Sequence, residues 1–289
     1  MARIGIYKGT RPSNGAQNLR NELRKSNDTA RVLLGQGSLW SGRDGDLLIN
    51  WGTRVDEVAR LRGQATLLNQ PGAVAIAGNK LTCLERLNEE NVSIVPFYRN
   101  INDALVHIND GGGRIYARTV LNGHSGEGIK LILRRDDPQA RLQLPDNAHF
   151  TDDHLPREIV EAQLFTIGMV GNRWEFRAHV VRGEPVLIQK KLRRTNENGE
   201  VDGGNPLIRN LASGWVYSVN ADIPQDIRDG ITREAVLAVE ALGLDFGAVD
   251  LIQPLNGGSP RVLEVNTAPG LEGETTLKAY CDAFLRIAQ

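Results

Sequence analysis

The chain has 289 residues, of which 40% are hydrophobic and 24% are charged, and its formal net charge is -1. This composition is ordinary for a folded protein and long enough for two or three compact lobes. A net charge so close to zero provides no global field that attracts nucleic acid, so we expect no nucleic-acid partner. No apolar run approaches the roughly 18–20 residues that a membrane span requires, so we expect no membrane partner.

Two features of the sequence favour a reducing compartment. The only cysteines, Cys83 and Cys281, are too far apart for a disulfide framework or a metal knuckle. The first residues, "MARIGIYKGTR", read as a short apolar strand followed by polar residues rather than as a secretory leader. The expected location is therefore cytoplasmic.

In chain order, residues 1–75 alternate predicted strands and helices. An apolar strand in "ARIGIYKGT" leads to a helix in "AQNLRNELRK", and "DLLINWGTR" is a second strand. The run "AVAIAGN" (73–79) is read as a third strand, followed by an amphipathic helix in "KLTCLERLNEENV" and a fourth strand in "SIVPFYR". This alternation predicts a small α/β lobe with a largely parallel sheet.

After this lobe the pattern changes to strand pairs with few helices. Residues 114–133 read as strand, glycine loop and strand, and two hairpins follow at residues 174–194 and 246–267. A long helix separates these hairpins, and another closes the chain. The sequence predicts antiparallel α+β lobes at residues 76–162 and 163–289, with the glycine-rich flap in the first of them.

The glycine loop "NGHSGEGIK" is the first candidate for ligand binding. Glycines let a backbone approach an anion closely and turn its N–H groups toward it. Because a strand follows instead of a helix, neither the dinucleotide fingerprint nor the Walker loop fits. A flap over phosphates and an ordinary glycine-rich hairpin both remain open. The loop residues concerned are Gly123, His124, Ser125, Gly126 and Gly128.

Several cations stand in strand-like apolar surroundings. Arg118, Arg177 and Arg209 are embedded in "IYARTV", "WEFRAHVV" and "PLIRNLA". A buried Arg needs an acidic partner, and bound phosphate would serve as one for a set of them. Clusters such as "QKKLRR", with Lys190 and Arg193, are more often solvated surface than ligand contacts.

Three oxygen-bearing side chains meet in the last predicted hairpin. Glu264 and Asn266 are two residues apart, so they project from one face of a strand. That pair alone is equally compatible with side chains satisfied by backbone amides. Asp250, however, lies in the partner strand "DFGAVDLI", and two opposed carboxylates repel unless a cation lies between them. The three residues predict a site for a hard cation such as Mg²⁺.

Taken in order, these motifs resemble those of the ATP-grasp superfamily. The set consists of Asn79-Lys80, a strand with Arg118, "GHSGEG", "EFR", "QKKLRR", "RN", "AVDL" and "LEVNTAPG". It is most similar to the carboxylate–amine ligases, namely the D-alanine–D-alanine ligases and the ribosomal-protein glutamate ligases. The resemblance runs from roughly Val74 to the end of the chain. It implies an α/β N-terminal lobe followed by α+β ATP-grasp lobes, with nucleotide bound between two antiparallel sheets.

The resemblance also implies roles for individual residues. Lys80 and Arg118 would contact ATP phosphates under the Gly123–Gly128 flap, and Lys190 would also bind the nucleotide. The strand around Gln163–Phe165 would offer backbone groups to adenine. Asp250, Glu264 and Asn266 would bind Mg²⁺, for which Mn²⁺ could substitute. Arg193 or Arg209 would stabilise developing negative charge. Arg118 replaces the Lys that is common in the family, and Gln163 replaces an acidic hinge residue, so Glu161 or Glu175 could take the ribose instead.

The substrate is the least defined part of the prediction. Lys8 and Arg11 follow the first strand, at the edge where open α/β sheets bind ligands, and Arg177 could also face a carboxylate. Alternatively, this loop only caps the next helix through Ser13 or Asn14.

The sequence therefore predicts an ATP- and Mg²⁺-dependent ligase that joins a carboxylate to an amine through an acyl phosphate. The expected acceptor is a small molecule such as an amino acid, a peptide or a protein, and a homodimer is one possible assembly. A kinase on the same scaffold and a nucleotide-binding module without turnover are the alternatives.

Overall fold

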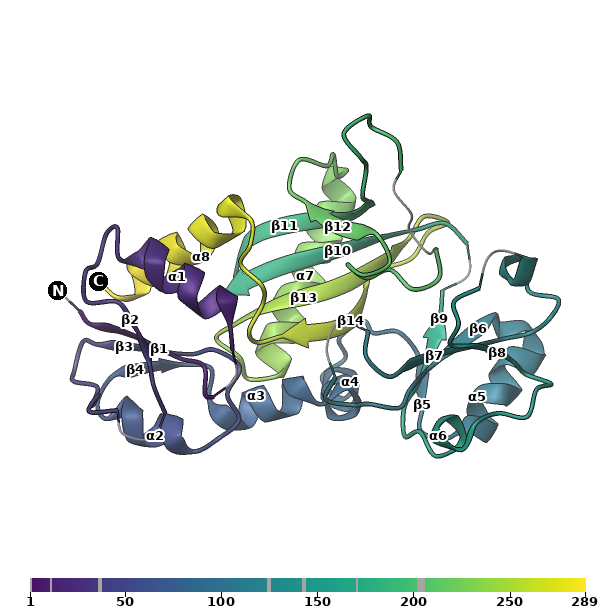
Figure 1. Ribbon diagram of the computed structural model, residues 1–289, viewed down its shortest axis with the longest axis horizontal. Helices are drawn as coiled ribbons and strands as arrows, with labels where there is room; N and C mark the ends of the chain where they lie inside the picture. Colours follow the sequence, from purple (N-terminus) through teal and green to yellow (C-terminus); the bar gives the residue numbers. More distant parts are fainter. Residues whose placement is uncertain are drawn as a thin grey trace.

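The computed structural model describes residues 2–10, 12–35, 38–123, 126–141, 144–169, 171–201 and 206–289. Three β-sheets, numbered below by their order in the chain, lie along the long axis of the molecule, with the third sheet between the first and the second (Figure 1). Both chain ends lie beside the first sheet (Figure 1). No helix among the described residues is both long and apolar enough to cross a membrane.

The first sheet is parallel, in the order β2-β1-β3-β4, which confirms the predicted α/β lobe. Every residue of β1 and β3 is buried, because one face packs on α1 and α8 and the other on Trp40, Val58 and Leu61. The short edge strands β2 and β4 carry too few residues to have been predicted. The elements are β1 (Ile4–Tyr7), α1 (Asn14–Leu23), β2 (Arg31–Leu33), β3 (Leu47–Asn50), α2 (Glu57–Arg62) and β4 (Thr66–Leu68).

The second sheet has the order β5-β9-β6-β7-β8 and is antiparallel except for the pair β7 and β8. Its core face packs on α5 and α6 through Ile115, Ala117 and Phe165. The elements are β5 (Phe97–Tyr98), α5 (Ile101–His107), a π-helical turn (Ile108–Gly112), β6 (Arg114–Arg118), β7 (Ile129–Leu133), a 3₁₀ turn (Pro138–Arg141), β8 (Ala148–Phe150), α6 (Arg157–Val160) and β9 (Phe165–Gly168).

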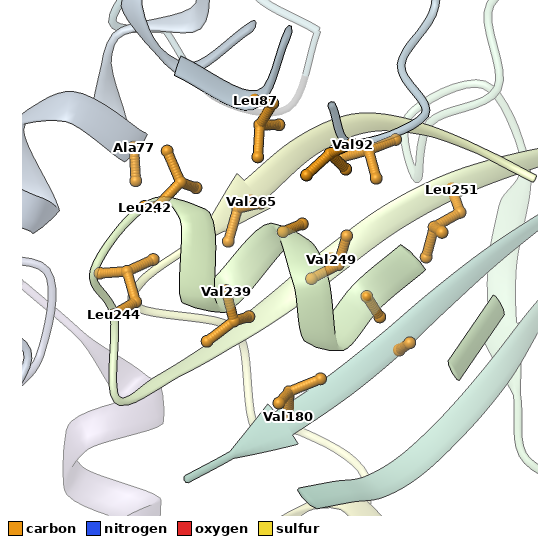
Figure 2. Packing of buried hydrophobic residues seen from close by; sticks show 14 of the residues in the cluster. Ala77, Leu87, Val92, Val180, Val239, Leu242, Leu244, Val249, Leu251 and Val265 are labelled. Carbon is orange, nitrogen blue, oxygen red and sulfur yellow. The ribbon is translucent and has the colours of Figure 1, made fainter. Parts of the chain in front are cut away.

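The third sheet is fully antiparallel, in the order β12-β11-β10-β13-β14, and contains both predicted hairpins. One face is covered by α7, and Figure 2 shows Val239, Val249 and Val265 packed between the helix and the strands. Alternate side chains therefore point to the opposite face, which is free to form a site. The elements are β10 (Arg173–Val181), β11 (Glu184–Arg193), β12 (Trp215–Ser218), α7 (Gln225–Ala241), β13 (Phe246–Pro254), β14 (Arg261–Asn266) and α8 (Glu274–Ile287).

The run 73–79, which we expected to form a strand, is helical over residues 73–78, which form most of α3 (Pro71–Gly78). A short apolar run does not by itself distinguish a buried strand from a buried helix. Pro71 at the first turn favours the helix, and both α3 and α4 (Lys80–Glu89) pack against β14. The predicted fourth strand, 93–99, is reduced to the two residues of β5.

Aromatic packing connects the first and third sheets. Trp51, which follows β3, stacks on Phe246 at 5.5 Å between ring centroids, and Tyr280 of α8 meets Trp51 edge-on at 6.0 Å. The two sheets therefore share one hydrophobic core. Strand β9 pairs with β6 in the second sheet, whereas β10, which follows it, belongs to the third. The domain boundaries after residues 75 and 162 stay predictions.

Candidate active site

A cavity of about 630 Å³ lies between the second sheet and the face of the third sheet that is opposite α7. Six cationic and four acidic side chains line it within the described part of the chain. This surplus of positive charge in a partly buried space favours a polyanionic ligand. The cations are Lys80, Arg118, Arg173, Arg177, Lys191 and Arg209, and the acids are Glu175, Asp250, Glu264 and Glu272.

Asp250 is held by Arg177 from the neighbouring strand. The guanidinium donates to both carboxylate oxygens, at 2.6 and 2.8 Å, and the Tyr217 hydroxyl donates to Asp250 at 3.2 Å. Burial alone would raise the pKa of Asp250, but the charge and hydrogen bonds of Arg177 lower it. Asp250 is thus a buried carboxylate that stays ionised.

The other two predicted metal ligands lie beside Asp250. Asp250 and Glu264 are direct cross-strand partners, and the Asn266 amide lies 3.5 Å from Asp250 Oδ2 and 3.4 Å from Glu264 Oε1. The Asn266 amide nitrogen thus donates to both carboxylates, and its oxygen would have to turn toward a cation to bind it. Two carboxylates and an amide are ligands that suit Mg²⁺, so the side chains present fit the ion.

Lys80 connects this group to the glycine loop. Asn79 caps α4 by accepting from the amides of Leu81 and Thr82, which places Lys80 at the first turn. Its ammonium donates to the carbonyl of Gly123 and lies 3.9 Å from Glu264. Burial lowers the pKa of Lys80, and the Glu264 carboxylate opposes that shift.

The glycine loop packs closely on its surroundings. At Gly128 (φ +68°) a Cβ would stand 2.7 Å from the amide nitrogen of Val120, and at Gly126 (φ +86°) it would stand 2.7 Å from the Asn210 amide. Glycine is therefore required at both positions for a physical reason. Gly126 lines the cavity, whereas Gly123 and Gly128 do not. His124 and Ser125 lie outside the described residues.

Arg118 points into the cavity with an unsatisfied donor. Its Nε is buried and has no hydrogen-bond partner among the described residues. Burial lowers the pKa of Arg118, and the Glu264 carboxylate opposes that shift. A buried guanidinium nitrogen without a partner is costly, and a phosphate oxygen would satisfy it.

Glu175 gathers three cations at one end of the cavity. It lies 3.0 Å from Lys191, 3.4 Å from Arg173 and 3.5 Å from Arg209. Burial lowers the pKa of Arg209 to about 10, and the charge of Arg173 acts in the same direction. Arg209 also stacks 4.5 Å from the ring of Trp215.

Two cations of "QKKLRR" do not line the cavity. Lys190 is paired with Phe176 across the strands and lies 3.4 Å above the ring of Trp174, on the α7 side of the sheet. Arg193 is exposed and lies 5.6 Å from the ring of Trp215. Lys191 is the lysine that lines the cavity. Arg177 pairs with Gln189 across the strands, and Lys191, two residues after Gln189, projects from the same face of the sheet. The two-residue period of the strand could therefore have identified Lys191.

The residues expected to hold adenine, Gln163 and Phe165, do not line the cavity. Gln163 is exposed, and Phe165 packs in the core of the second sheet. The following residues, Thr166 to Met169, line the cavity instead. Arg173 donates to the carbonyl of Met169 at 3.4 Å, which ties this segment to the cluster around Glu175.

Of the predicted substrate residues that the structure describes, one lines the cavity and one does not. Arg177 lines the cavity but is paired with Asp250, and Lys8 is not part of the cavity wall. Arg11 lies outside the described residues. Ser13 caps α1 by accepting from the amide of Ala16, as the alternative interpretation of this loop expected. The segment 268–273, after β14, supplies the cavity wall nearest to this lobe.

Comparison with known proteins gives weak but consistent sequence similarity. No family model matches the chain. A probable alpha-L-glutamate ligase of Cellvibrio japonicus is 26% identical over 208 residues, covering 71% of this chain and 60% of that protein. A second one, from Rhodopirellula baltica, is also 26% identical, and the chain spans 45% of its length. The ribosomal protein bS6–L-glutamate ligase of Salmonella paratyphi B is 27% identical over 235 residues, covering 80% of this chain and 69% of that protein.

Solved structures are similar over the whole chain. The D-alanine–D-alanine ligase of Bacillus anthracis has a TM-score of 0.62 at 14% identity, with 100% of this chain and 99% of that chain covered. The ATP-grasp ligase PsnB, complexed with a minimal precursor, Mg and ADP, has a TM-score of 0.65 at 14% identity and the same coverage. The chain therefore has the ATP-grasp fold, and the resemblance to carboxylate–amine ligases that its motifs indicate is confirmed.

Proposed function

We propose that the chain is an ATP-dependent ligase that forms an amide bond between a carboxylate and an amine. The observation that carries the proposal is the cavity wall, where Asp250, Glu264 and Asn266 converge opposite a surplus of cations. The names of the sequence relatives, which are glutamate ligases, support the same reaction class. Glutamate, as donor or acceptor, and a peptide or protein as its partner are the substrates to test first.

We assign different parts of MgATP to different residues along the cavity. Thr166 to Met169 and Glu175 would hold the adenosine, and Lys80, Arg118 and the glycine loop would hold the phosphates. Asp250, Glu264 and Asn266 would hold Mg²⁺, which, when bound, neutralises phosphate charge during transfer. Arg209 and Lys191, which share the Glu175 carboxylate with Arg173, are the candidates to stabilise developing charge, since Arg177 makes two hydrogen bonds to Asp250.

The proposed chemistry proceeds in two steps. A carboxylate oxygen attacks the γ-phosphorus of ATP, the bond to ADP breaks, and an acyl phosphate forms. The amine nitrogen then attacks the acyl carbon and loses a proton, and inorganic phosphate leaves. Positioning and electrostatics carry both steps, so no covalent protein nucleophile is required. Cys83, the cysteine nearest to Lys80 and Glu264, is unsuited to that role because burial raises its pKa to about 12.

The test supplies MgATP with L-glutamate and a panel of peptide and amino-acid partners, and measures ADP, free phosphate and products by mass spectrometry. A ligase releases ADP and phosphate together, and only when carboxylate and amine are both present. A kinase releases ADP and yields a phosphorylated product without free phosphate. The absence of ATP binding by calorimetry would overturn the proposal. ATP binding without turnover across the panel would favour the non-catalytic module.

A further inference from the structure

A line of buried polar side chains leads from the cavity into the core that joins the first and third sheets. Tyr280 of α8 lies 3.1 Å from Nδ1 of His179 on β10, and Nε2 of His179 lies 2.9 Å from Oε1 of Gln189 on β11. The Gln189 amide donates to Thr276 Oγ1 at 3.2 Å. Gln189 and Thr276 line the cavity, whereas His179 and Tyr280 are 1% and 0% exposed behind them.

The orientation of the Gln189 amide in the structure sets the direction of every hydrogen bond in this line. Because the Gln189 amide nitrogen faces Thr276, its oxygen faces His179, and His179 Nε2 must donate to it. A neutral imidazole then accepts at Nδ1, so the Tyr280 hydroxyl donates there. Burial, with a smaller effect from Arg177, lowers the pKa of His179 to about 4, which keeps the ring neutral near pH 7.

With the hydrogen bonds in this direction, the Thr276 hydroxyl is a donor at the cavity end of the line. Thr276 Oγ1 already accepts from Gln189, and no described residue accepts its hydroxyl proton. Thr276 lies in the first turn of α8, a 14-residue helix whose N-cap, Gly273, has no side chain to cap it. The free hydroxyl proton and the uncapped amides of the first turn would both donate to an oxyanion.

The line lies away from the proposed adenosine end. Along β10, Arg173 contacts the segment 166–169, Arg177 faces Asp250, and His179 lies two residues further, toward the first sheet. An oxyanion at Thr276 is therefore placed beyond the proposed metal group, at the end of the cavity opposite the segment 166–169.

We propose that His179 is a positioning residue that orients Gln189 so that the Thr276 hydroxyl donates to a substrate oxyanion in the cavity. The oxyanion is a carboxylate of the acid or amine substrate, or a phosphoryl oxygen of the nucleotide. The activity readout of this inference rests on the proposed ligase function, whereas the hydrogen-bond direction is measurable without it.

The first experiment is ¹⁵N NMR of the imidazole of the full chain, with His179→Gln to assign the signal. We expect a protonated Nε2 and an unprotonated Nδ1 that do not titrate between about pH 6 and 9. In Tyr280→Phe, the Nδ1 signal should move while Nε2 stays protonated. A protonated Nδ1 in the wild type, or titration near pH 6.5, overturns the inference whether or not the chain is a ligase.

The second experiment measures steady-state kinetics with L-glutamate and ATP varied separately. Thr276→Val and His179→Leu should each raise the KM for one substrate by about tenfold, since each removes or misdirects a hydrogen bond to a charged group. Thr276→Ser and His179→Gln, which keep the donors, should stay within about threefold of the wild type. The double variant Thr276→Val/His179→Leu should be no worse than the poorer single variant, because both act on one hydrogen bond.

The substrate whose KM rises identifies the oxyanion, since glutamate indicates a carboxylate and ATP a phosphoryl oxygen. Additive losses in the double variant, or a loss in His179→Gln equal to that in His179→Leu, would overturn the positioning role. If His179→Leu does not fold, Gln189→Leu takes its place, because that change is made at the cavity wall. If the wild type turns over no substrate, the ligase proposal fails, and the NMR result alone decides the inference.

Discussion

Arg177 and Asp250 face each other on paired strands and form two parallel hydrogen bonds, at 2.6 and 2.8 Å. The sequence suggested separate roles for them, one for a substrate and one for a metal. Their pairing means that a buried carboxylate in the proposed metal group has a permanent counter-charge. The site can therefore hold two neighbouring carboxylates, Asp250 and Glu264, before any cation binds.

Removing that counter-charge should destabilise the fold. Asp250 is 7% exposed, and Arg177→Leu leaves its charge buried without a strong partner. We expect a loss of about 3 kcal/mol in the free energy of unfolding, measured by urea titration. The matched control is Arg157→Leu, because the Arg157 side chain is 87% exposed and forms an i,i+4 ion pair with Glu161. This change should alter the free energy of unfolding by less than about 0.5 kcal/mol. Equal effects would contradict the structural role of the pair.

The metal assignment predicts a specific loss in Glu264→Gln. Calorimetry should show that Mg²⁺ raises the affinity of the wild type for ATP, because the ion bridges carboxylates and phosphate oxygens. In Glu264→Gln this enhancement should fall by about tenfold or more, while ATP binding without Mg²⁺ should be unchanged or tighter as one negative charge is removed. Glu272→Gln, on the same wall, is the control and should retain the enhancement. Loss in both variants would point to the overall charge of the cavity instead.

The adjacent lysines of "QKKLRR" provide a test of the sheet geometry. Lys191 lies in the cavity and bonds to Glu175 at 3.0 Å, whereas Lys190 lies on the opposite face over Trp174. Lys191→Ala should lower MgATP affinity or turnover by tenfold or more, since it removes a charged donor and leaves Glu175 with fewer partners. Lys190→Ala should stay within about twofold of the wild type. The reverse order would mean that β11 has a different register.

Gly52 should resist substitution for reasons of space as well as conformation. Its φ is +78°, and a Cβ there would stand 2.7 Å from Cβ of Ala268 in the cavity wall. Gly45 has the same conformation, with φ +79°, but nothing lies within 4 Å of a Cβ. Thermal unfolding should therefore show that Gly52→Ala loses about 1–3 kcal/mol more than Gly45→Ala. Equal losses would show that the contact with the wall is not tight.

His179 should make the fold sensitive to acid. Its pKa is about 4 in the folded protein, because of burial and the nearby Arg177 charge, with Asp250 and Gln189 acting in opposition, against 6.5 in an unfolded chain. The unfolded state then binds more protons between these values, so stability falls as pH is lowered from about 6.5 to 4. The loss from this group is about 3 kcal/mol at the lower end.

Urea titrations across that pH range should show a shallower decline in His179→Gln than in the wild type, because the variant lacks the titrating group. Parallel declines in the two proteins would mean that carboxylates alone govern acid unfolding and that His179 does not titrate with a lowered pKa.

The spacing of apolar residues was sufficient to predict the helices and strands in which that spacing is regular. Strands β1 and β3 of the first sheet, both hairpins of the third sheet and the helices α4, α7 and α8 could be predicted from their apolar runs and periods. The run 73–79 could not, since its six apolar and small residues, 73–78, fit a buried strand and a buried helix equally, and only packing of α3 on β14 separates them.

In the candidate site, too, some contacts could be predicted from the sequence and others could not. The sequence by itself determined that Asp250, Glu264 and Asn266 would meet, because hairpin pairing and the two-residue period of a strand fix their relation locally. Only the tertiary structure decided that Arg177 would be paired with Asp250 and that Lys191 would enter the cavity. It alone also joined His179 to Thr276 through Gln189. These contacts join residues on four different elements, β10, β11, β13 and α8, and their distances depend on how the sheets and α8 pack, which no local period encodes.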